Sequence, residues 1–271
     1  MTANQVARAV HDVLARTARQ QFGTGRILPL GGPADGSWIT ERAAADALRA
    51  AVGPPAGVRV GALRLSVADP GSAPRPTVPA PPSALPPGPL RITADFAALA
   101  DRPLPATAGM LRTALLDAAE RELGLLVAAV DLRADGLLEP DGPDEPDGPD
   151  EAGRAGQAEA AGPAVPGTAA APPDTADTTS PATDGRTGAT REGPDALAAA
   201  ALAVPGVARL APALGAPSRP VRLDDGHALI QLATAAGHRP LDVARAVRAA
   251  VAVVEPGPET VAVLVTAVAR D

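Results

Sequence analysis

Residues 227–254 read HALIQLATAAGHRPLDVARAVRAAVAVV, and this stretch decides the fold. Its opening, residues 227–233, is a short run of mostly apolar residues, which is typical of a buried strand. Pro240 suits the first turn of a helix. The apolar residues after it recur every three or four positions and form one stripe: Leu241, Ala244, Val247, Val251 and Val254. The stretch therefore predicts a strand followed by an amphipathic helix over 240–254.

The flanking residues extend this pair into a small α/β unit. Residues 195–204 are rich in alanine and predict a helix, and Pro205-Gly-Val207 predicts a turn. Residues 221–223 predict a strand, joined to the next by Asp224-Asp-Gly226, a typical hairpin turn. Residues 261–268 predict a closing strand. The order is helix, strand, strand, helix, strand.

An internal repeat predicts a second copy of this unit in the first half. Arg102-Pro-Leu104 and Arg239-Pro-Leu241 lie 137 residues apart. At that offset Ile92 matches Leu229, Met110 matches Val247 and Glu122 matches Glu259, and one shift aligns Val130 with Val268. The elements predicted for this copy are a helix over 40–52, a strand over 58–67 with a bulge near Gly61, a strand over 90–96, a helix from Pro105 and a strand over 125–132.

These patterns predict an α+β fold with two small two-layer α/β modules. A three-stranded sheet with one open face is marginal alone, so we expect the modules to pack together as a pseudo-dimer. The predicted segments are an N-terminal amphipathic helix and clasp over 1–39, a first module over 40–138 with a proline-rich insertion at 69–89, a linker over 139–194 and a second module over 195–271. We expect the insertion to be extended or disordered. The linker is acidic, lacks large apolar residues and predicts disorder.

Composition excludes several function classes. The 271 residues include no cysteine and no tyrosine, which excludes disulfides, thiolate metal sites and thiol nucleophiles. Outside residues 139–195, 18 acidic residues face 21 arginines that are scattered along the chain, a poor pattern for binding nucleic acid. No Gly-x-Ser-x-Gly motif occurs, and we expect neither enzymatic activity nor a cofactor. No apolar run predicts a signal peptide or a membrane span, so we expect a cytoplasmic protein.

Two groups of residues are candidates for binding. Val6, Val10 and Val13 lie on one face of the predicted helix over 4–20, and Trp38 follows the turn-rich stretch of the clasp. Trp38 either anchors a partner or packs the N-terminal helix against the first module. The second group combines carboxylates and imidazoles and could hold a metal if the ends of the strand and loop meet: Asp224, Asp225, His227 and His238. The alternative is that Asp224-Asp-Gly226 is only a hairpin turn.

The exposed side of the helix from Pro105 carries charges of both signs. Asp117, Glu120 and Glu122 lie among Arg112 and Arg121, which predicts a solvated face.

The second module resembles the alkaline-shock, or envelope stress response, family of bacterial proteins. Residues 198–210, AAAALAVPGVARL, resemble the family's opening helix and its valine, x, glycine, valine turn. Residues 228–232, 239–248 and 261–268 resemble its central strand, its second helix and its closing valine-rich strand. The overall layout also resembles actinobacterial proteins labelled after a nucleopolyhedrovirus fibrous-body protein.

The alkaline-shock resemblance implies a non-catalytic cytoplasmic scaffold or interaction protein with a role in envelope homeostasis. Such a protein self-associates, binds a paralogue, or is held at the inner face of the cell membrane by a membrane-anchored envelope protein. A small-ligand or metal-binding module that uses the carboxylates and imidazoles named above is the alternative.

Overall fold

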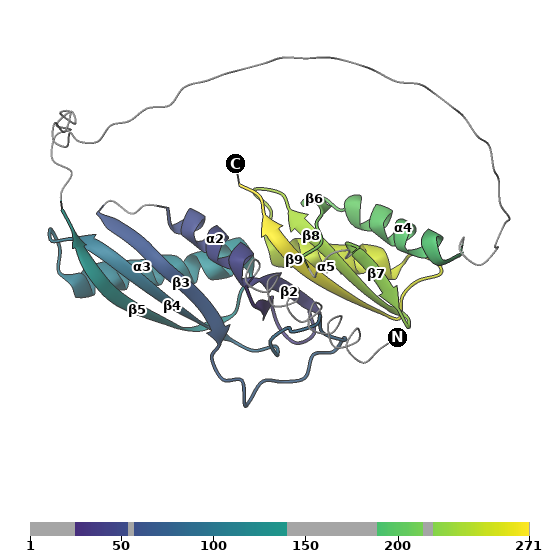
Figure 1. Ribbon diagram of the computed structural model, residues 1–271, viewed down its shortest axis with the longest axis horizontal. Helices are drawn as coiled ribbons and strands as arrows, with labels where there is room; N and C mark the ends of the chain where they lie inside the picture. The colour runs from purple at the N-terminus through teal and green to yellow at the C-terminus, as the bar shows by residue number, and fades with distance from the viewer. Residues whose placement is uncertain (1–24, 54–56, 140–188, 214–218, 271) are drawn as a thin grey trace, which may run out of the picture.

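The computed structural model describes residues 25–53, 57–139, 189–213 and 219–270. They form an α+β fold with two sheets and four α-helices (Figure 1). The predicted N-terminal helix, with Val6, Val10 and Val13, lies outside the described residues, as does most of the predicted linker.

The first module has the predicted order. Its elements are α2 (Glu41–Val52), β3 (Val58–Val67), β4 (Leu90–Leu99), α3 (Leu104–Asp117), the π-helical turn η1 (Ala118–Leu123) and β5 (Val127–Leu138). Thr40 caps α2, since its hydroxyl accepts a hydrogen bond from the Ala43 N–H. β4 lies between β3, which is antiparallel to it, and β5, which is parallel. The predicted bulge in β3 is confirmed by a register shift between Val60 and Leu63.

The second module has the same order with one exception. Its elements are α4 (Ala189–Leu202), β6 (Val207–Leu210), β7 (Val221–Asp224), β8 (His227–Thr234), α5 (Pro240–Ala252) and β9 (Thr260–Val268). Two strands, β6 and β7, stand where the first module has β3. The predicted hairpin turn is confirmed, because Asp225 and Gly226 both have positive φ, as a type I′ turn requires. The strand β6 follows directly on Gly206, where the sequence predicts only a turn.

The clasp adds two strands to the sheet of the second module. β1 (Ile27–Pro29) and β2 (Ser37–Thr40) form the predicted hairpin, and β2 pairs in parallel with β9. The resulting six-stranded sheet has the order β1-β2-β9-β8-β6, with β7 also paired to β8. Both faces of the clasp are apolar and buried, so its strands need cover on two sides. The boundary predicted between residues 39 and 40 is therefore not a boundary between folded units.

The proline-rich insertion packs across the outer face of this sheet. We call residues 68–89 the strap. Leu85 donates its N–H to the Ile27 carbonyl at 2.8 Å, and Thr77 donates to the Pro33 carbonyl at 3.2 Å. The strap residue Val78 is buried in a small apolar cluster with residues of four strands: Ile27, Trp38, Leu229, Ala262 and Leu264. Of the two expectations for the insertion, extended or disordered, the structure has the extended one.

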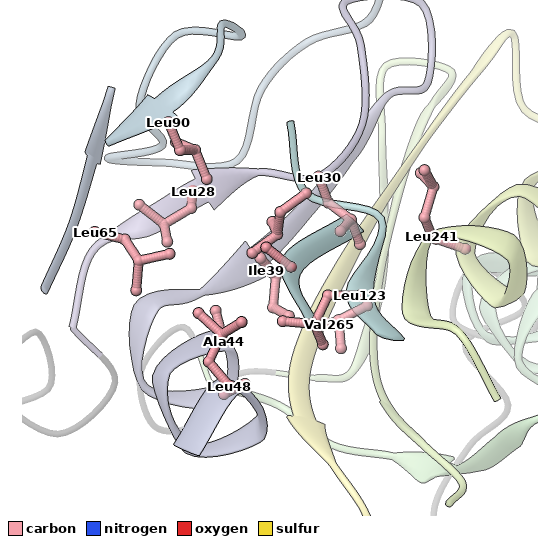
Figure 2. Packing of buried hydrophobic residues seen from close by; sticks show 14 of the residues in the cluster. Leu28, Leu30, Ile39, Ala44, Leu48, Leu65, Leu90, Leu123, Leu241 and Val265 are labelled. Carbon is pink, nitrogen blue, oxygen red and sulfur yellow. The ribbon is translucent and has the colours of Figure 1, made fainter. Parts of the chain in front are cut away.

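A single apolar core joins the two modules. Figure 2 shows the part of it where three clasp residues, Leu28, Leu30 and Ile39, meet residues of both modules. Leu65 and Leu90 come from the first module's sheet, and Val265 and Leu241 come from the second module. The two modules therefore pack together, with the clasp and α2 between them (Figure 1).

The repeat is real in structure, but its register differs from the one the Arg-Pro-Leu tripeptides suggest. α3 and α5 begin 136 residues apart, at Leu104 and Pro240. At this offset the buried pairs Leu111 with Val247 and Leu115 with Val251 coincide. Met110, which the sequence matched to Val247, is 49% exposed. The apolar face of the helix sets the register, because that face must meet the sheet.

The alignment of the strands between the two modules must be corrected in the same way. Ile92 faces the shared core, whereas Leu229 faces the strap, so the counterpart of Ile92 is Ala228. Ile92 pairs with Val130, and Ala228 pairs with Val261. Val130 therefore corresponds to Val261 and not to Val268. Both modules also have a register shift at the same place in the parallel pair, after Phe96 and after Leu232.

Candidate functional site

The structure does not bring together the four residues proposed for a metal site. Asp224 and Asp225 lie at the turn between β7 and β8, and His227 is the first residue of β8. His238 lies beyond the other end of β8, and an eight-residue strand spans about 23 Å. Across the ranges described above, no three His, Cys, Asp or Glu side chains are grouped so that they could hold a metal ion. The alternative interpretation, a hairpin turn, accounts for Asp224 and Asp225.

His227 is held by a neighbouring strand. Its Nδ1 lies 2.8 Å from the Thr260 hydroxyl of β9. Burial lowers the pKa of His227 below its ordinary value, and the nearby Asp224 carboxylate opposes this shift only in part. His227 is therefore neutral at physiological pH and joins two parallel strands.

Trp38 is not on the surface. It is 2% exposed and lies under the strap, in the cluster with Val78 and Leu264. Its indole N–H has no hydrogen-bond partner among the residues that the structure describes. The prediction that Trp38 anchors a partner does not agree with this position, because a buried indole presents no surface. Its apolar contacts instead hold the strap onto the sheet.

The two modules differ most at the outer edge of their last strand. In the second module, β2 covers the edge of β9: Ser37 pairs with Val263, Trp38 with Leu264 and Ile39 with Val265. The corresponding strand of the first module, β5, is an edge strand, and in the described parts of the chain its only strand partner is β4. One module thus shows how such an edge is covered, and the other leaves it open.

An arginine from the helix marks this edge in both modules. Arg248 of α5 donates its Nε–H to the Val261 carbonyl at 3.0 Å. Arg112 of α3, which is 136 residues earlier, donates its Nε–H to the corresponding carbonyl, that of Val130, at 3.2 Å. The sequence placed Arg112 on a solvated face. An alignment of the two modules at an offset of 136 would have paired Arg112 with Arg248, whereas the offset of 137 aligns Arg112 with Ala249.

In the second module this arginine also holds the turn that precedes the added strand. The Nη1 atom of Arg248 donates hydrogen bonds to the carbonyls of Ala34 and Asp35, which lie in the loop between β1 and β2. Arg245 adds a two-point ion pair with the Asp35 carboxylate, at 2.8 and 3.2 Å. Arg112, by contrast, is exposed, and within the described residues its one hydrogen bond goes to Val130.

The backbone of β5 presents hydrogen-bonding groups at the open edge. Leu90 donates its N–H to the Leu126 carbonyl at 2.7 Å, so alternate residues of β4 direct their backbone groups to β5. The residues paired with them direct theirs away from the sheet, and these are Val130, Leu132 and Ala134. The corresponding residue of Leu132 is Val263, whose N–H donates to the Gly36 carbonyl of the clasp at 3.1 Å.

Charged and apolar side chains surround this edge. Among the described residues nothing covers the outer face of the first sheet, which carries a ladder of charges that includes an Arg91 to Asp131 ion pair at 2.6 Å. Arg133 is the next residue of β5 whose side chain lies on the outer face of the sheet, and it corresponds to the apolar Leu264 beneath the strap. On the other side, Leu116 of α3 is 36% exposed and lies one turn beyond Arg112, whereas Met110 lies on the opposite flank of the helix, beside Val58 of β3. We call the β5 edge, the outer face of this sheet and the exposed side of α3 the open surface of the first module.

Within its described residues, the chain has no helix that is both long and apolar enough to cross a membrane. Comparison of the chain with protein-family models, with curated proteins and with solved structures finds no match.

Proposed function

We propose that the protein is a non-enzymatic scaffold that binds other proteins, and that its binding surface is the open surface of the first module. One observation carries this proposal. The second module covers the edge of its last strand with the clasp and the outer face of its sheet with the strap, whereas no described part of the chain covers the corresponding edge and face of the first module. Exposed strand edges pair readily with other chains, and exposed apolar patches are typical of protein interaction sites.

The resemblance of the second module to the alkaline-shock family supports a role in envelope homeostasis. On this proposal the protein works in the cytoplasm, and its partner is a paralogue or a membrane-anchored envelope protein that holds it at the inner face of the membrane. Self-association through the same surface belongs to this proposal.

The test is a pull-down of the tagged full chain from its own host, followed by identification of the proteins recovered. We would compare the wild type with Leu116→Glu, which places a charge on the exposed side of α3, one turn beyond Arg112. Val253→Glu is the matched control, because Val253 is also apolar and 78% exposed but lies after α5 in the second module. A third sample without residues 1–23 tests the contribution of the predicted N-terminal helix.

We expect a specific partner that Leu116→Glu depletes and Val253→Glu leaves unchanged. Recovery of a membrane-anchored protein or an alkaline-shock paralogue would support the envelope role. Equal recovery by both variants would contradict the placement of the surface, and the absence of any specific partner would overturn the scaffold proposal.

A further inference from the structure

We propose that the outer edge of β5 accepts an extended segment of a partner protein as a parallel strand, in the way that β9 accepts β2, and that Arg112 binds the turn before that segment. This inference rests on the proposed function and names the contact within the open surface. It is argued from the correspondence between the two modules, residue by residue.

The backbone groups needed for such a strand are present. Val263 and Val265 pair with Ser37 and Ile39 of the clasp, and their counterparts in β5 are Leu132 and Ala134. The N–H and C=O groups of both counterparts point away from the sheet. An added parallel strand would therefore find the same pattern of donors and acceptors that β2 finds on β9.

Arg112 fixes where the added strand begins. In the second module Arg248 occupies the Val261 carbonyl, so the strand pairing starts two residues later, at Val263. The remaining N–H groups of Arg248 then bind carbonyls of the turn that leads into β2. Arg112 occupies the Val130 carbonyl in the same way, and a guanidinium carries five N–H donors. It can therefore hold a turn whose carbonyls are free.

This arrangement favours a parallel segment over a second copy of β5. An antiparallel pair of β5 strands centred on Arg133 would place Arg133 opposite Arg133 and Asp131 opposite Asp135, which repel. A pair centred on Leu132 avoids this repulsion but needs the Val130 carbonyl, which Arg112 already occupies. The parallel arrangement needs neither.

The side chains around the edge define the chemistry of the partner. The residue of the partner that lies opposite Arg133 occupies the place of Trp38, but on an uncovered face where a cation replaces Leu264. A carboxylate at this position would pair with Arg133 from the open side of β5, while Asp95 of β4 lies beside Arg133 on the other side. The residues on either side of it face α3, as Ser37 and Ile39 face the core, and small or apolar side chains fit there. The partner segment is thus a turn followed by an extended run in which an acidic residue lies between apolar ones.

A displayed library of random peptides is selected for binding to the full chain, and the dissociation constant of each enriched peptide is measured. Ala134→Pro removes one outward N–H, and proline is tolerated on an edge strand where the N–H faces solvent. Arg112→Ala removes the proposed turn-binding cation. Arg121→Ala is the matched control, since it removes the same charge from an exposed side chain whose ion pair is with Asp117. Circular dichroism and Trp38 fluorescence confirm that each variant is folded.

We expect enriched peptides with an acidic residue between apolar ones. Both Ala134→Pro and Arg112→Ala should raise their dissociation constants about tenfold, and Arg121→Ala should leave them unchanged. Orientation is tested by disulfide cross-linking, because the chain has no cysteine of its own. A peptide with an N-terminal cysteine should cross-link to Ala128→Cys and not to Leu137→Cys, at the other end of β5.

Peptides that bind Ala134→Pro and Arg112→Ala as well as they bind the wild type would overturn the β5 site but leave the scaffold proposal standing. The reverse cross-linking pattern would overturn the parallel arrangement. Failure to enrich any peptide, with a dimer in sedimentation that Ala134→Pro abolishes, would show that a second copy occupies the edge, and would overturn the partner segment. If no peptide is enriched, no dimer forms and the pull-down also recovers no partner, both proposals fail.

Discussion

Leu65→Ala should destabilise both modules together. Leu65 lies in β3 with its side chain fully buried, in the same core as the clasp residues Leu28 and Ile39. Truncation of a fully buried leucine removes its apolar contacts and leaves a cavity, which costs about 2–5 kcal/mol of the free energy of unfolding. We take about 3 kcal/mol. With a urea m value of about 2 kcal/mol/M, the unfolding midpoint should fall by about 1.5 M.

The assay compares two probes of the same urea titration. Trp38 is the sole tryptophan and is buried in the sheet of the second module, so its fluorescence follows that sheet. Far-ultraviolet circular dichroism follows the helices and strands of both modules. If one core joins the modules, Leu65→Ala shifts both transitions equally, although Leu65 and Trp38 belong to different sheets.

A Trp38 transition that keeps the wild-type midpoint, while circular dichroism shows a second, earlier transition, would refute the reasoning. It would mean that the modules unfold independently and that the clasp does not couple them. Leu137→Ala is the control: Leu137 is 64% exposed, so its truncation should change the free energy of unfolding by less than about 0.5 kcal/mol.

Three further predictions concern single residues. Gly124→Ala should destabilise the fold by more than Gly53→Ala: both glycines have positive φ, but an added methyl at Gly124 would collide with Leu241 of the other module, whereas at Gly53 it meets open space. Thermal denaturation measures both, and equal losses would contradict the close approach. Asp35→Asn should flatten the loss of stability in acid. Burial raises the pKa of Asp35, but the hydrogen bonds from Arg245 and the Gly32 N–H, together with the charges of Arg245 and Arg248, outweigh burial and lower that pKa. The wild type therefore has extra stability at a pH above the ordinary pKa of about 4, and it loses this stability as the pH falls through the lowered pKa. Melting temperatures of the two proteins that stay parallel down to about pH 2 would count against this ion pair. His227→Gln should remove a second slope, because burial lowers the pKa of His227 and the folded state therefore loses stability as the pH falls below about 6.5 toward that lowered value. Urea midpoints measured across this range test it, and a variant that keeps the wild-type slope would exclude His227 as its source.

Local patterns in the sequence were sufficient for most elements of the fold. The stripe through Val247 and Val251 predicts α5, Thr40 predicts the start of α2, and Asp225-Gly226 predicts the turn between β7 and β8. Each of these depends on residues within a few positions of one another. The order helix, strand, strand, helix, strand follows from such patterns in the first module, and in the second they predict every element except β6.

The relations that the sequence did not predict are all long-range. The pairing of Trp38 with Leu264 joins residues more than two hundred positions apart, and nothing in the clasp itself indicates its partner. The burial of the strap residue Val78 against the second sheet has the same origin. The repeat was misaligned by one residue because the Arg-Pro-Leu tripeptides were matched by identity, whereas burial of one helix face fixes the register. The candidate site depended on this shift of one position, because only the offset of 136 pairs Arg112 with Arg248.

The position of β9 in the sheet also constrains how the protein is made. β9 is the last of the described elements to leave the ribosome, and it lies between β2 and β8 in the sheet. Until β9 has been made, the clasp has no parallel partner, and Trp38 and Ile39 lack the strand with which they pair. The second sheet therefore cannot close before β9 has been made, and until then the clasp is an apolar hairpin without its parallel partner.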